Sequence, residues 1–110
     1  MKVHISQLQD RLIKTAKRSP CNIRVSAAGI DNRGIVIALS YNLIRHDIPH
    51  SRYRGWHAEE RVIHSSPMSL VRIVIARIGL GGNLLPIDPC SHCSKLARKR
   101  NISIVKIQEV

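Results

Sequence analysis

Two short motifs, His57-Ala58-Glu59 and Pro89-Cys90-Ser91-His92-Cys93, constrain this chain more than any other feature. Within them, His57, Cys90 and Cys93 supply one imidazole and two thiols in a spacing typical of zinc ligands, and zinc prefers nitrogen and sulfur. For His57, Cys90 and Cys93 to bind one ion, the fold has to bring two distant segments together. Three protein ligands leave the fourth tetrahedral position for water, which is typical of a catalytic zinc site. We therefore expect one Zn²⁺ per chain.

Glu59 follows the candidate ligand His57 by two residues. This spacing allows a carboxylate to reach over the metal and exchange protons with a bound water without being a ligand. Zinc lowers the pKa of such a water toward neutrality, so the pattern indicates hydrolytic chemistry with Glu59 as the catalytic residue. Two alternatives stay open: a closed structural zinc site with His64 or His92 as fourth ligand, and a metal-free redox pair of the two cysteines.

Composition predicts one small α/β domain. The chain has 110 residues, enough for a single compact domain over residues 1–110. It has no Phe and only three other aromatic residues, so Ile, Leu and Val must form the core. Such a core suits a sheet packed against helices.

The charge balance favours a polyanionic partner. Eighteen Lys and Arg against seven Asp and Glu give a formal charge of +11. Nucleic acid, a phosphate-bearing substrate or a membrane surface would suit this charge, as would a solubilising surface or a basic face covered in an oligomer. We expect a nucleotide or single-stranded nucleic acid and no membrane, because no apolar run is long enough to span one.

The cysteines favour a reducing compartment. Cys90 and Cys93 are better used on metal than in a disulfide, and oxidation would remove them as ligands. Cys21 begins an apolar run and is expected to be a buried structural thiol. The N-terminus lacks an apolar signal core, so we expect a soluble cytoplasmic protein.

Periodicity and chain breakers predict the element order α-β-β-α-β-α-β, a three-layer sandwich with a mixed sheet of four to five strands. The expected helices cover 3–18, 56–64 and about 90–100, and the expected strands cover 21–29, 35–39, 70–78 and 102–107. A turn at 31–34 should make the first two strands an antiparallel hairpin. Both metal motifs fall at helix starts, where the helix dipole favours thiolates.

These motifs together resemble the cytidine deaminase-like superfamily, whose members act on cytidine, deoxycytidylate, tRNA adenosine or polynucleotide cytosine. The element order extends the resemblance over nearly the whole chain. It implies that His57, Cys90 and Cys93 bind zinc and that Glu59 is the proton shuttle. It also implies substrate contacts for Ala58 and for Asn42, which resembles an asparagine that hydrogen-bonds the substrate sugar. As an alternative, Asn42 is simply a turn residue.

Two features of the chain depart from that resemblance. Many members continue beyond the last strand, whereas this chain stops at Val110. The uncovered edge strand at about 102–108 would then invite pairing with a second chain, so a homo-oligomer through this strand is expected. Trp56, just before His57, is expected either to pack or to stack on a base.

The loop before the first motif should decide the substrate. It leads into the zinc helix and contains Arg52, Tyr53 and Arg54, cations beside an aromatic ring that suit a single-stranded nucleic-acid path. A merely solvated loop is the alternative. A second basic cluster, at 95–100, is read as a solvated helix face.

The expected function is a zinc-dependent hydrolase acting on a C–N bond. It would convert cytosine to uracil in a nucleotide or single-stranded nucleic acid, with a zinc-bound hydroxide as nucleophile. An adenosine-type deaminase is one alternative. The other is a catalytically idle, zinc-stabilised protein of the same fold that binds nucleic acid or serves in assembly.

Overall fold

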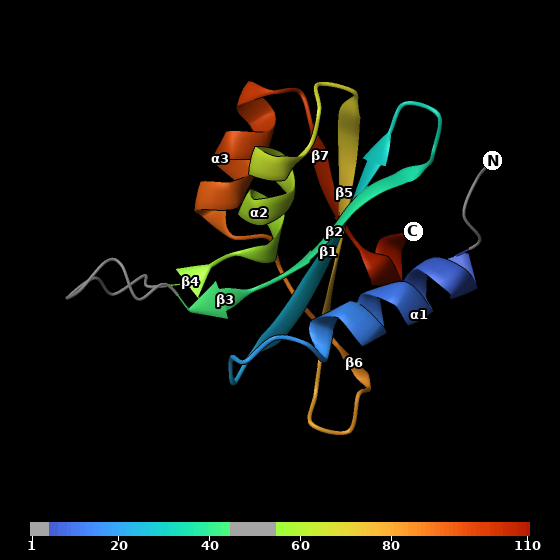
Figure 1. Cartoon of the computed structure of the whole chain (residues 1–110), viewed down its shortest axis with the longest axis vertical. Coiled ribbons are helices and arrows are strands. Elements are labelled where there is room, and N and C mark those ends of the chain that lie inside the picture. The colour runs from blue at the N-terminus through green and yellow to red at the C-terminus, as the bar shows by residue number, and fades with distance from the viewer. Residues whose placement is uncertain (1–4, 45–54) are drawn as a thin grey trace.

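The computed structural model describes residues 5–44 and 55–110, and the described residues form three layers (Figure 1). The chain runs through α1 (Ile5–Ala16), β1 (Arg24–Asp31), β2 (Val36–Tyr41), β3 (Leu43–Ile44), β4 (Gly55–Trp56), α2 (Ala58–Ser65), β5 (Leu70–Ile78), β6 (Leu84–Leu85), α3 (Ser91–Lys99), β7 (Ser103–Lys106) and a closing 3-10 turn, Ile107–Glu109. Helix α1 covers one face of the main sheet, and α2 and α3 cover the other. No helix of the described ranges has the length and apolar character that crossing a membrane requires.

The main sheet is mixed, as predicted. Strand β1 pairs antiparallel with both β2 and β5, and β5 pairs antiparallel with the short β6. Strand β7 pairs with β5 in parallel, through Arg72 to Ile75. In the described part of the chain β7 has no partner on its other side, so it is an edge strand as expected.

The central strands β1 and β5 are buried on both faces. Ala27 packs with α2 on one face, whereas Ala28 packs with Leu8 and Leu12 of α1 on the other. The side of β1 that carries Ser26 and Ala28 is therefore not solvated. Ser26 is completely buried, and its hydroxyl is satisfied by donating a 2.7 Å hydrogen bond to the Leu12 carbonyl.

Helices α2 and α3 are fixed to each other and to the sheet. Val62 and Ile63 of α2 and Ala97 of α3 are buried in one apolar cluster with Ile73 and Ile75 of β5. This packing sets the ends of α2 and α3 that carry the metal motifs.

A hydrogen bond between the ends of the two helices adds to that packing. Arg100, at the end of α3, donates a 2.7 Å hydrogen bond to the Ile63 carbonyl. Because the bond joins the C-terminal ends of α2 and α3, it limits how far their N-terminal ends can move apart.

Most predicted elements are confirmed, and the differences have physical causes. Strand β1 begins at Arg24 and not at residue 21, because residues 19–23 are held by hydrogen bonds to Asn42. Trp56 lies in β4, paired with Leu43, and not in a helix. Strand β6 was not predicted, since two residues are too few to show a period.

Candidate active site

His57, Cys90 and Cys93 converge although they come from two segments. Their potential ligand atoms, one imidazole nitrogen and two sulfurs, all lie within 4.8 Å of one another. Two sulfurs bound to one zinc would lie about 3.8 Å apart, since each Zn–S bond is about 2.3 Å long. The three residues therefore fit one tetrahedral ion, and within the described residues no fourth protein ligand joins them.

Both halves of the cluster sit at helix N-termini, as predicted. His57 is the residue that precedes α2, and its extended backbone places its carbonyl to accept the first helical bond, from Arg61 at 3.1 Å. Cys90 precedes α3 in the same way, and Cys93 lies in the first turn. Free backbone N–H groups and the helix dipole favour negative charge at such positions, which suits thiolate ligands.

Two contacts fix the start of α2. Glu60 accepts a 3.2 Å hydrogen bond from the backbone N–H of His57, and so caps the helix. Arg61 donates a 2.6 Å hydrogen bond to the Tyr41 carbonyl at the end of β2, and its guanidinium lies 4.8 Å from the centre of the Tyr41 ring. The candidate ligand is thus held beside Asn42, which follows Tyr41.

The negative charges around Cys93 favour a bound cation. Burial raises the pKa of the Cys93 thiol well above its ordinary value, and the negative charges of Glu59, Cys90 and Glu60 raise it further. A divalent cation between the three ligands would oppose these effects, because it stabilises the thiolate form. The donor set of one imidazole and two thiols is one that zinc uses.

Glu59 is buried and lies outside the ligand cluster. It is only 3% exposed, in the first turn of α2, and it lines a pocket of about 300 Å³ together with His57, Ala58 and Cys90. A carboxylate buried beside metal ligands but not used as one is placed for proton transfer. This is the role that the sequence predicts for it, and the role itself stays a prediction.

Asn42 lines the same pocket, and its amide also holds the chain together. Its Oδ1 accepts hydrogen bonds from Ser19 Oγ at 2.7 Å and from the Val25 backbone N–H at 2.9 Å. Its Nδ2 donates to the Ile23 carbonyl at 2.7 Å, which leaves one Nδ2 hydrogen without a partner among the described residues. The structural role of Asn42 is therefore plain, and one donor remains for a substrate.

The other predicted substrate residues are not placed. Arg52, Tyr53 and Arg54 lie outside the described residues, and so does the side chain of Trp56. Of the two histidines considered as a fourth ligand, neither joins the cluster. His92 has a largely exposed side chain 3.6 Å from Glu60, and His64 lies at the far end of α2.

The sequence missed several pocket residues. Cys21, Ile23, Ile87 and Asp88 also line the pocket. Cys21 is half-buried in this wall and not in the core as expected, and its thiol lies 3.6 Å from the Asn42 carbonyl. The one signal for Ile87 and Asp88 was their place between Pro86 and Pro89, in the connector that leads to Cys90.

Comparison with known proteins identifies the fold. No family model and no curated protein matches the sequence. Among solved structures, cytidine deaminase from Mycobacterium leprae is 20% identical with a TM-score of 0.65, over 97% of this chain and 91% of that one. The chain has a cytidine deaminase-like fold.

Two further structures agree with this fold. Cytidine deaminase from Burkholderia pseudomallei is 18% identical with a TM-score of 0.65, over 90% of this chain and 78% of that one. The enzyme from Mycobacterium tuberculosis is 18% identical with a TM-score of 0.61, over 94% and 85% of the two chains. At these identities the likeness concerns the deaminase-like fold alone.

Proposed function

We propose that this chain is a zinc-dependent hydrolytic deaminase that converts cytosine to uracil in a nucleotide or single-stranded nucleic acid. One observation carries the proposal: His57, Cys90 and Cys93 converge on one point, and the buried carboxylate of Glu59 lies in the same pocket. The deaminase-like fold supports it. A closed structural site would have a fourth protein ligand, and none joins the cluster in the described residues.

The reaction consumes one water and releases one ammonia. Zinc held by the three ligands would supply a water molecule that loses its proton near neutral pH. The Glu59 carboxylate accepts that proton and delivers it to the ring nitrogen next to the amino-bearing carbon. The water oxygen forms a bond to that carbon, and Glu59 then transfers the second proton of this oxygen to the departing amine, so that the C–N bond breaks with loss of ammonia and the carbon becomes a carbonyl. Backbone N–H groups at the start of α2 and the free Asn42 hydrogen are available to orient the base and sugar.

The decisive experiment compares deamination of cytidine, deoxycytidylate, cytosine-containing single strands and adenosine. We expect the wild-type protein to form uracil, and Glu59→Gln to lower kcat by about 100-fold or more. Asp10→Asn, which removes an exposed carboxylate on the opposite face of the sheet, is the matched control. Conversion of adenosine alone would contradict the choice of cytosine.

Metal analysis of the same preparations completes the test. We expect about one zinc per chain, lost in Cys90→Ser and kept in Cys21→Ser, because Cys21 lines the pocket without joining the cluster. A zinc-loaded protein that converts no substrate would refute the deaminase proposal and leave an idle, zinc-stabilised protein of the same fold.

A further inference from the structure

A second pocket adjoins the one that contains His57 and Glu59. Its volume is about 570 Å³, and it shares the wall residues Ile23, Ile87 and Asp88 with the first pocket. Small-molecule sites in proteins have volumes of about 300–1,000 Å³. A ligand larger than a base and its sugar could therefore extend from the first pocket into the second.

Arg77 lines this second pocket and has an unsatisfied buried donor. Its Nε is buried without a hydrogen-bond partner. Neither a hydrogen bond nor an ion pair joins its guanidinium to any residue in the ranges 5–44 and 55–110. A buried donor without a partner is costly in free energy, so such a group calls for a ligand or water.

Strand geometry places Arg77 on the same face of the sheet as α2. Residues 72–78 of β5 pair with β1 in unbroken register, so alternate side chains point to the same face. Ile73 and Ile75 pack in the cluster that contains Ala58 and Val62 of α2. Arg77 follows two residues after Ile75, so it faces the layer that carries Glu59.

The carboxylates of the second pocket already have a cation. Lys106 Nζ lies 2.7 Å from Asp88 Oδ1 and 3.6 Å from Glu109 Oε1. Among the described residues, Arg77 is thus the cation of this pocket that has no anionic partner. The planar fork of a guanidinium matches the oxygens of a phosphate group in geometry and charge.

We propose that Arg77 binds a phosphate group of the substrate, and so makes this site selective for cytosine nucleotides over nucleosides. The inference rests on the proposed function, since it assigns the base to the pocket of His57 and Glu59. The bound group is a phosphate ester of the nucleoside sugar, either the monoester of a free nucleotide or the diester of a strand.

The test compares kcat/KM for cytidine, cytidine 5′-monophosphate and a short single strand with one cytosine. Arg77→Met keeps the length of the side-chain stem, and Arg77→Lys keeps the charge without the fork. Arg72→Met is the control, because Arg72 is exposed on the same strand, points to the other face and lies outside both pockets.

We expect Arg77→Met to lower kcat/KM about tenfold or more for phosphorylated substrates. Cytidine should be little affected, and Arg77→Lys should retain part of the lost activity. A lower kcat/KM for the monophosphate or for the strand supports the proposal, and the substrate that shows it identifies the source of the phosphate. An equal loss for cytidine, or no loss for any substrate, would overturn it.

A binding measurement separates this inference from the proposed function. Cytidine 5′-monophosphate should raise the melting temperature of the wild-type protein more than cytidine does, and Arg77→Met should abolish the difference. If no substrate is deaminated but this difference is seen, the phosphate site stands and the deaminase proposal fails. If deamination occurs without any such difference, the phosphate site is refuted and the deaminase proposal stands.

Discussion

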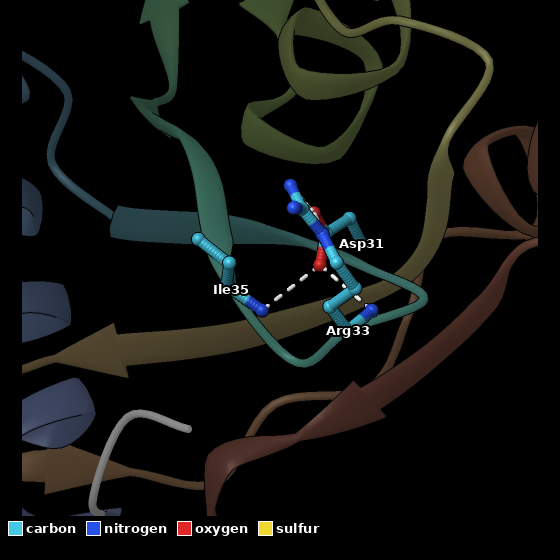
Figure 2. A network of polar contacts seen from close by, with 3 residues as sticks. All are labelled: Asp31, Arg33 and Ile35. Atoms are coloured by element: carbon cyan, nitrogen blue, oxygen red, sulfur yellow. Dashed lines mark hydrogen bonds and ion pairs between the residues drawn. The ribbon is translucent and has the colours of Figure 1, made fainter. Parts of the chain in front are cut away.

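At the scale of single residues, the Asp31 carboxylate organises the turn between β1 and β2. Figure 2 shows its Oδ1 accepting hydrogen bonds from the backbone N–H groups of Ile35, at 3.0 Å, and Arg33, at 2.9 Å. Its Oδ2 lies 3.2 Å from Arg33 Nη2. The pKa of Asp31 is lowered foremost by the hydrogen bond from the Ile35 N–H. The Arg33 N–H and guanidinium lower it further, whereas burial of the carboxylate has the opposite effect.

The lowered pKa makes part of the stability depend on pH. The pKa of Asp31 is lower in the folded than in the unfolded chain, so ionised Asp31 stabilises the fold at pH values above its ordinary pKa of 3.8. This stabilisation is lost as the pH falls through the pKa that Asp31 has in the folded chain. We predict that Asp31→Asn lowers the free energy of unfolding in urea at about pH 7 and that the difference shrinks below about pH 4. Exposed Asp10→Asn should change little at either pH. A difference for Asp31→Asn that is constant with pH would contradict the prediction.

At the scale of elements, the distance between β1 and α2 depends on Gly29. A Cβ at this position would lie 2.7 Å from Val62 Cγ1 and 2.9 Å from Leu70 Cδ1. Both are closer than packed carbon atoms allow, so a side chain here would force Val62 of α2 and Leu70 of β5 to shift. Since His57 and Glu59 are at the start of α2, the close approach of Gly29 also sets the position of the candidate site.

We predict that Gly29→Ala lowers the free energy of unfolding by about 1–3 kcal/mol, the usual cost of overpacking a core. Denaturant titration measures it. Gly81→Ala is the matched control, because the atom nearest to its Cβ would be Asn83 Oδ1 at 3.6 Å, an ordinary contact. Equal effects of the two substitutions would show that backbone entropy, and not packing against α2, is responsible.

At the scale of the whole molecule, the formal charge of +11 is concentrated partly on α3. Three exposed cations of this helix line one shallow pocket: Lys95, Arg98 and Lys99. No ion pair joins them to a carboxylate in the described ranges. Helix α3 also carries Cys93. If the substrate is a negatively charged strand, these unpaired cations are available to its phosphates.

We predict that binding of a single-stranded oligonucleotide weakens strongly between about 50 and 200 mM salt, because phosphate contacts release counterions. Fluorescence anisotropy with the Glu59→Gln variant measures binding without turnover. The double variant Lys95→Gln, Lys99→Gln should flatten the salt dependence more than Lys14→Gln, Lys17→Gln near the end of α1. Affinity that hardly changes with salt would refute a polynucleotide partner.

Much of this fold could be predicted because its signals are local. Strand β5 has its predicted bounds, since its apolar run lies between Pro67 and Gly79. The start of β1 was wrong because Asn42, about twenty residues away, holds the preceding segment through its amide. Strand β6 was not predicted because its two leucines are extended through pairing with β5, and two residues show no pattern of their own.

The sequence alone determined the candidate ligand set and the candidate proton shuttle Glu59, because the chemistry of zinc demands those residue types at short spacings within each motif. It could not determine what surrounds them. Cys21 was expected to be a buried structural thiol and lies in the pocket wall. From the sequence, Arg77 was only a polar residue within an apolar strand, and its place in a pocket became visible once β1, β6 and β7 were arranged around β5. Pocket walls and unpaired charges depend on segments far apart in the chain, so only the tertiary structure decided them.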